Sequence, residues 1–94
     1  IAVFLEDTPR LIQALENAAS KPDYAGLREA AHSLKSSSAN LGAMALSAAA
    51  KRVELGARAE SLDRPAVAVA VIANEYARAR HALLATTSRN AAEA

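Results

Sequence analysis

The amino-acid sequence predicts an all-α fold, an antiparallel four-helix bundle. Hydrophobic residues make up 52% of the chain, yet alanine supplies much of that share and the only aromatic residues are one phenylalanine and two tyrosines. Alanine is the best helix former and adds little volume, so closely packed helices are favoured over a sheet. Three glycines and three prolines interrupt 94 residues, and apolar residues recur at helical spacing in four stretches. This length allows one domain with one core.

The first helix is expected over about residues 1–19. Its candidates for burial are Phe4, Leu5, Leu11, Ile12 and Leu15. Pro9 lies inside this stretch and lacks a backbone donor. It either begins a new helix near Thr8 or kinks a continuous one, and the sequence leaves both open.

The second helix is expected over Tyr24–Leu41. Ser20 or Asp23 can cap its N-terminus, and Gly42 stands where a left-handed C-cap is expected. On a helical wheel, a buried stripe falls within roughly 40°. It comprises Leu27, Ala31, Leu34, Ser38 and Leu41, with Ala30 at its edge.

Two further helices complete the bundle. The third is expected over residues 43–59, with an apolar face of Leu46, Ala49, Ala50, Val53 and Ala57. The fourth is expected to begin at the turn of residues 61–65, with Asp63 as N-cap and Pro65 within its first turn, and to end at about Thr86. Its apolar stripe is Val69, Ile72, Tyr76 and Leu83. The bundle therefore occupies residues 1–87, and residues 88–94 form a frayed C-terminal tail.

Composition excludes several classes of function. The chain has no cysteine, which excludes disulfides, thiol catalysis and cysteine-ligated metals. Its net charge of +1, without a basic stripe, gives no support to nucleic-acid binding. No apolar run approaches the ~20 residues that cross a bilayer, so we expect no direct membrane contact. A glycine-rich phosphate loop is also missing.

His32 is the candidate functional residue. On the wheel it lies about 140° from the buried stripe, so its ring should face solvent. Its neighbours on this face are Arg28, Glu29, Lys35, Ser36 and Ala39. Neutral imidazole can attack a phosphoryl group, and an ammonium group one turn away can neutralise the phosphoryl oxygens. A lone exposed histidine is more often an ordinary solvated side chain, which is how we interpret His81.

A resemblance to a known family favours the functional interpretation of His32. Residues 31–43 read A-H-S-L-K-S-S-S-A-N-L-G-A. This segment closely resembles the motif of histidine-containing phosphotransfer (Hpt) domains of bacterial phosphorelays, roughly A-H-x-L-K-G-S-S-x-x-L-G-A. Residues 4–9 and 53–54 also look like the family's flanking segments, so the resemblance spans nearly the whole chain. Ser36 replaces the usual glycine, and Ala50 stands where the family often has cysteine.

The resemblance implies a phosphocarrier without autonomous catalysis. His32 would accept a phosphoryl group from a receiver-domain aspartate and pass it to another receiver aspartate, with Lys35 assisting the phosphoryl group. The expected docking residues are Arg28, Glu29, Ser36 and Ala39. The chain would need no cofactor of its own, because Mg²⁺ is expected in the partner receiver domain. With no aspartate beside His32 in the sequence, we expect a passive acceptor.

Several alternatives stay open at this level. The chain could be a helical adaptor bundle that binds signalling partners without phosphotransfer. Glu29-x-x-His32 has the spacing of a di-iron site, but it occurs once and faces outward. The domain could also head a chemotaxis-type kinase. We expect a cytoplasmic location, either free or as the C-terminal domain of a membrane-bound hybrid sensor kinase.

Overall fold

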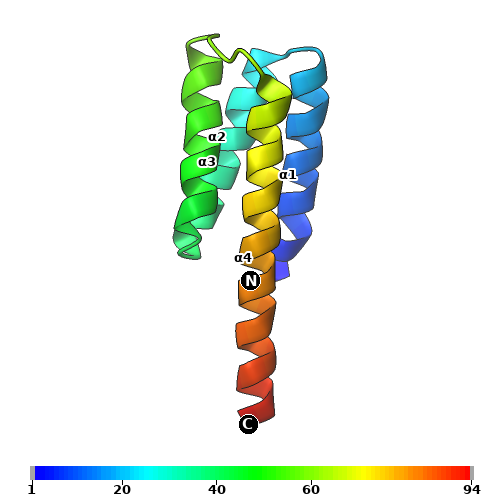
Figure 1. The fold of residues 1–94 in the computed structure, drawn as a ribbon, viewed down its shortest axis with the longest axis vertical. Coiled ribbons are helices and arrows are strands. Elements are labelled where there is room, and N and C mark those ends of the chain that lie inside the picture. Colours follow the sequence, from blue (N-terminus) through cyan, green and yellow to red (C-terminus); the bar gives the residue numbers. More distant parts are fainter. Residues whose placement is uncertain (1, 94) are drawn as a thin grey trace.

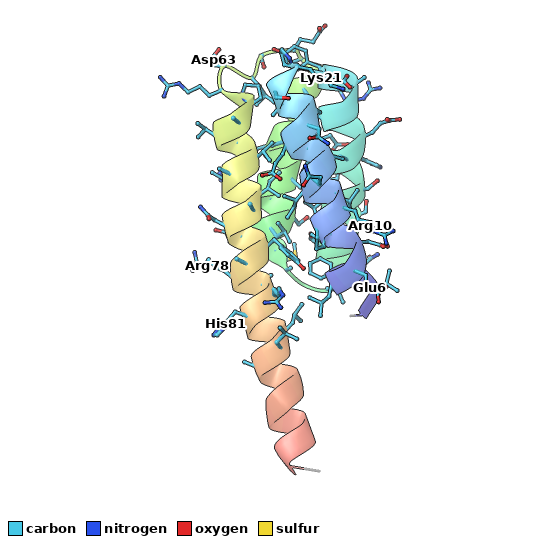
Figure 2. The ribbon with its side chains drawn as sticks, turned by 90° about the vertical axis from the view of Figure 1, so that its right-hand side faces the viewer. Glu6, Arg10, Lys21, Asp63, Arg78 and His81 are labelled. Carbon is cyan, nitrogen blue, oxygen red and sulfur yellow. The ribbon has the colours of Figure 1, made fainter. Side chains whose placement is uncertain are left out.

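Four helices form the protein, and the computed structural model describes residues 2–93, with side-chain burial for residues 3–85. They are α1 (Ala2–Ser20), α2 (Tyr24–Asn40), α3 (Met44–Arg58) and α4 (Pro65–Glu93). They lie side by side along one axis, and α4 packs against both α1 and α3 (Figure 1). Lys21 and Asp63, in the first and third connections, lie at the same end of the bundle (Figure 2). The predicted all-α bundle is therefore confirmed.

The ends of α2 are set by local chemistry that the sequence indicates. The Asp23 carboxylate accepts a hydrogen bond of 3.1 Å from the Gly26 N–H, which makes Asp23 the N-cap. Ser20 instead donates to the carbonyl of Asn17. Gly42 has a φ of 78°, the left-handed conformation that favours glycine after a helix. These two signals fix where the helix that carries His32 begins and ends.

The structure resolves the role of Pro9 in α1 and corrects the predicted N-cap of α4. Pro9 lies within one continuous helix and does not begin a new one. Asp63 is not the N-cap of α4, contrary to the sequence prediction. The Arg64 carbonyl accepts the first backbone hydrogen bonds, from Val67 and Ala68, so Arg64 holds that position and Pro65 is the first helical residue.

The C-terminal helix is longer than the sequence predicts. The backbone of α4 is helical to Glu93, past the expected end near Thr86, and it extends beyond the other three helices (Figure 1). No glycine or proline follows Pro65, so the alanine-rich sequence has no stop signal. The side chains of the predicted tail, residues 88–94, lie outside the described residues. The domain boundary at residue 87 stays a prediction.

The core lies between the facing stripes of the four helices. It is formed by Phe4, Ile12, Leu15, Ala18, Leu27, Ala30, Ala31, Leu34, Leu46, Ala49, Ala50, Val53, Ala57, Val69 and Ile72. Leu5, Leu11, Tyr76 and Leu83 are only partly buried against it. Leu41, predicted to be buried, is 37% exposed. It is the C-cap, one residue past the last helical residue of α2 and directly before the left-handed Gly42, so its side chain lies at the end of the helix and only partly against the core.

Replacing Leu34 by alanine tests the orientation of α2. Leu34 is fully buried, so Leu34→Ala should lower the free energy of unfolding by about 2–4 kcal/mol through lost burial and a cavity. Thermal and urea denaturation measure this. Leu41→Ala is the matched control and should cost much less, because that side chain is partly exposed. Equal effects would contradict the orientation of α2.

Candidate functional site

His32 stands on the outer side of α2, next to α3. Its side chain is 61% exposed, as the helical wheel predicts. One ring nitrogen, Nδ1, lies 2.5 Å from Oε2 of Glu54, a residue of α3. The exposed ring is therefore anchored at one edge by a neighbouring helix.

Glu54 is a buried carboxylate with cationic partners. Its side chain is only 3% exposed. Lys35 donates a hydrogen bond of 2.6 Å from Nζ to Oε1, and an Arg58 nitrogen lies 3.9 Å from Oε2. A buried carboxylate is costly unless hydrogen-bonded and paired, and these contacts satisfy that need.

The charge of Glu54 fixes the proton on the histidine ring. The Lys35 hydrogen bond holds the pKa of the Glu54 carboxyl below its ordinary value; burial opposes this shift, and His32 adds to it. The carboxylate is thus ionised at neutral pH and can only accept hydrogen bonds. Nδ1 must then carry the proton and donate a hydrogen bond to Glu54. In the neutral ring, Nε2 is left with a free lone pair.

A second hydrogen bond ties α2 to α3 beside the site. Ser47, which is buried on α3, donates from Oγ to the backbone carbonyl of Lys35 at 3.0 Å. This bond lies on the side of Lys35 that faces α3. It helps to fix the part of α2 from which Lys35 reaches Glu54.

The predicted docking residues all lie exposed on α2. They are Arg28, Glu29, Ser36 and Ala39. Arg28 and Glu29 line a small pocket of about 240 Å³ together with His32, Glu54 and Arg58. Ser36 and Ala39 are short, so they leave the approach to the imidazole ring open. The exposure of these four residues agrees with the helical wheel, whereas the pocket was not predicted from the sequence.

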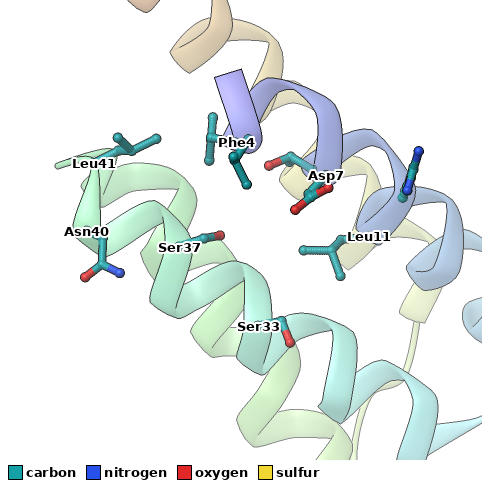
Figure 3. A pocket seen from close by; sticks show the side chains of 10 residues that line it. Phe4, Asp7, Leu11, Ser33, Ser37, Asn40 and Leu41 are labelled. Carbon is teal, nitrogen blue, oxygen red and sulfur yellow. The ribbon is translucent and has the colours of Figure 1, made fainter. Parts of the chain in front are cut away.

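A larger groove of about 580 Å³ lies between α1 and α2. Its walls include Phe4, Asp7 and Leu11 on one side and Ser33, Ser37, Asn40 and Leu41 on the other (Figure 3). None of the predicted docking residues lines it. The groove and His32 thus lie on neighbouring faces of the same helix.

The contact of Glu54 with His32 was not predicted from the sequence. The sequence has no aspartate beside His32, but α3 brings the carboxylate of a glutamate to the ring from 22 residues away. The sequence did contain a sign of this contact. Glu54 follows Ala50 by one helical turn and so interrupts an apolar stripe with a charge.

The other candidate sites gain no support. Among the described residues, no group of three or more histidine, cysteine, aspartate or glutamate side chains could hold a metal ion. Glu29 and His32 line the same pocket, but both are exposed. His81 is exposed on α4, far along that helix from the first turn (Figure 2).

Comparison with known proteins identifies the family. The family model of the Hpt domain matches residues 1–82, which include all of the site. The chain belongs to the Hpt domain family. No curated protein and no solved structure was found to match it. Hpt domains carry phosphoryl groups in phosphorelays without catalysing reactions themselves, and they interact with receiver domains. Within the described residues of this Hpt domain, no helix is long and apolar enough to span a membrane.

The pH dependence of stability tests the charge of Glu54 in this Hpt domain. The pKa of the Glu54 carboxyl is lower in the folded state than its ordinary value of 4.5. The contribution of the ionised carboxylate to the free energy of unfolding is therefore complete above pH 4.5 and is lost as pH falls through the lowered pKa. At neutral pH, Glu54→Gln should lower the free energy of unfolding by about 1–3 kcal/mol. The difference from the unsubstituted protein should shrink below about pH 4.

Chemical denaturation between pH 3 and about pH 7 gives this difference directly. Glu29→Gln is the control, because it removes an exposed carboxylate one turn from His32 and should change stability by less than about 0.5 kcal/mol. A Glu54→Gln effect that stays constant over the whole range would show that the carboxylate is not preferentially ionised in the fold.

Proposed function

We propose that His32 accepts a phosphoryl group from the aspartyl phosphate of one receiver domain and passes it to an aspartate of another. The observation that carries this proposal is the hydrogen bond between Nδ1 and the buried Glu54 carboxylate. It assigns the free lone pair to Nε2, on a ring that is mostly exposed to a partner. Membership of the Hpt family supplies the general chemistry, and the geometry favours His32 as the residue that performs it.

In the transfer step, the Nε2 lone pair attacks phosphorus. An N–P bond forms while the P–O bond to the receiver aspartate breaks, and the bonding electron pair leaves with the receiver carboxylate. The proton on Nδ1 stays in place, so the ring becomes positively charged. Glu54 stabilises that charge through the hydrogen bond it already makes, as a carboxylate does for a histidine that acts as a base. The onward step to the second receiver reverses these changes.

Lys35 has two tasks in this proposal. Its ammonium group neutralises Glu54, which keeps the carboxylate ionised without an excess of negative charge next to the histidine. It also stands one helical turn from His32, where its positive charge favours an incoming phosphoryl group. Mg²⁺ would be held by the receiver domain, so the protein described here supplies the nucleophile and its surroundings.

The receiver would dock over the exposed ridge of α2. Arg28, Glu29, Ser36 and Ala39 surround the ring on this ridge and would contact the receiver directly. Ser36 is slightly larger than the glycine usual in the family, which would shift the closest approach. A typical interface covers about 800 Å² on each partner. A receiver positioned over His32 would therefore also cover part of the apolar groove between α1 and α2.

Transfer of radioactive phosphate from a phosphorylated receiver tests the role of His32. The unsubstituted protein should acquire an acid-labile, alkali-stable label, because its nitrogen–phosphorus bond breaks in acid. His32→Gln should acquire none, whereas His81→Gln should be labelled like the unsubstituted protein. Label that persists in His32→Gln, or no label from any receiver of the host with the fold intact by circular dichroism, would refute the proposal. The second result would favour an adaptor bundle.

A double-mutant cycle tests the coupling of Lys35 and Glu54. Lys35→Ala and Glu54→Gln should each slow transfer about tenfold, since a charge-assisted hydrogen bond exceeds a neutral one by about 1.4 kcal/mol. The double variant should be slowed by less than the product, because the two residues act through one ion pair. Stopped-flow or rapid-quench rates measure this. An unchanged rate in Lys35→Ala would remove Lys35 from the mechanism.

A further inference from the structure

The small pocket beside His32 is bordered by two arginines that the mechanism above leaves unused. Arg28 precedes His32 by four residues on α2, and Arg58 follows Glu54 by four residues on α3. Residues one turn apart lie on the same side of a helix, so the two guanidinium groups come to one pocket from two helices. Lys35 stands one turn beyond His32 in the opposite direction along α2.

The cations around His32 differ in what they are bound to. The Lys35 ammonium is engaged by Glu54 at 2.6 Å. The Arg58 guanidinium is 3.9 Å from Glu54, beyond hydrogen-bond length, and its side chain is 62% exposed. Arg28 is exposed and forms no ion pair within the described part of the chain. Both arginines therefore have donors available to a new anion.

Phosphorylation of His32 would add up to two negative charges to a residue that lines this pocket together with the two arginines. The two carboxylates that line it are Glu29, which is exposed, and Glu54, whose charge is balanced by Lys35 and by the ring itself. The two guanidinium groups are the cations that line the same pocket. A guanidinium presents parallel N–H donors that match phosphoryl oxygens.

We propose that Arg28 and Arg58 form a phosphoryl-binding pair that holds the oxygens of phosphorylated His32. This inference rests on the proposed function, because it requires the phosphoryl group to be on His32. It gives Arg28 a second role beside receiver docking. It also gives Arg58, which the sequence analysis did not single out, contact with the reacting group.

Chemical phosphorylation tests the pair without a receiver, which separates phosphoryl binding from docking. Phosphoramidate transfers its phosphoryl group to Nε2 as its own N–P bond breaks and ammonia leaves. The whole chain is labelled in this way, and ³¹P NMR follows the titration of the phosphoryl group. Opposite charges lower the pKa of an anion. We expect the pKa of that group to rise by about half a unit in Arg28→Gln and in Arg58→Gln, and by about one unit in the double variant.

Two controls isolate the contact. Arg52→Gln removes the same charge from an exposed position of α3 that does not line the pocket, and it should titrate like the unsubstituted protein. Arg58→Lys keeps the positive charge, so the pKa of the phosphoryl group should stay close to that in the unsubstituted protein. A double variant that is labelled at His32 and titrates like the unsubstituted protein would overturn the arginine pair and leave the proposed function standing. Failure of phosphoramidate to label His32 in the unsubstituted protein would overturn both.

Discussion

The buried carboxylate of Glu54 is the constraint on which the site depends. It is almost fully removed from solvent, so it must be hydrogen-bonded and paired, and both of its close partners, His32 and Lys35, come from α2. Satisfying it fixes the rotation of α2 relative to α3. The same contact places the proton on Nδ1 and leaves Nε2 to react. One interaction therefore links the packing of two helices to the chemistry of the ring.

The alanine-rich composition makes this contact possible. Ala31 on α2 and Ala50 and Ala57 on α3 are buried, and Ser47 both packs and donates to the backbone of α2. Small side chains let helix axes approach to the lower end of the usual 8–10 Å. Across this interface of small side chains, Glu54 of α3 reaches His32 and Lys35 of α2. The position that often holds cysteine in the family is here the fully buried Ala50, which is consistent with a packing role.

Stability and the proposed function use different sides of α2. The inward side of α2 carries Leu27 and Leu34, which are fully buried. Its outward side carries the histidine and short or charged residues, which contribute little to the core. Glu54 belongs to both parts, since it lies in the apolar stripe of α3 and its carboxylate bonds to His32 and Lys35 on α2. Substitutions of the exposed residues on α2 would therefore test the proposed partner recognition and phosphoryl binding while the bundle stays folded.

The sequence by itself determined the four helices, the glycine that ends α2, most of the buried stripes and the exposure of His32, because helical period and capping chemistry are local properties of the chain. It left the N-cap of α2 open between Ser20 and Asp23. It also carried the motif around His32 that the family comparison supports. It failed at Leu41 and Asp63, where a one-residue shift at a helix end changes the environment of a side chain, and at the end of α4, which has no stop signal. Only the tertiary structure decided that Glu54 and Arg58 stand beside His32. A helical wheel shows which side a residue occupies, but which helix faces that side, and at what height, depends on how the bundle packs.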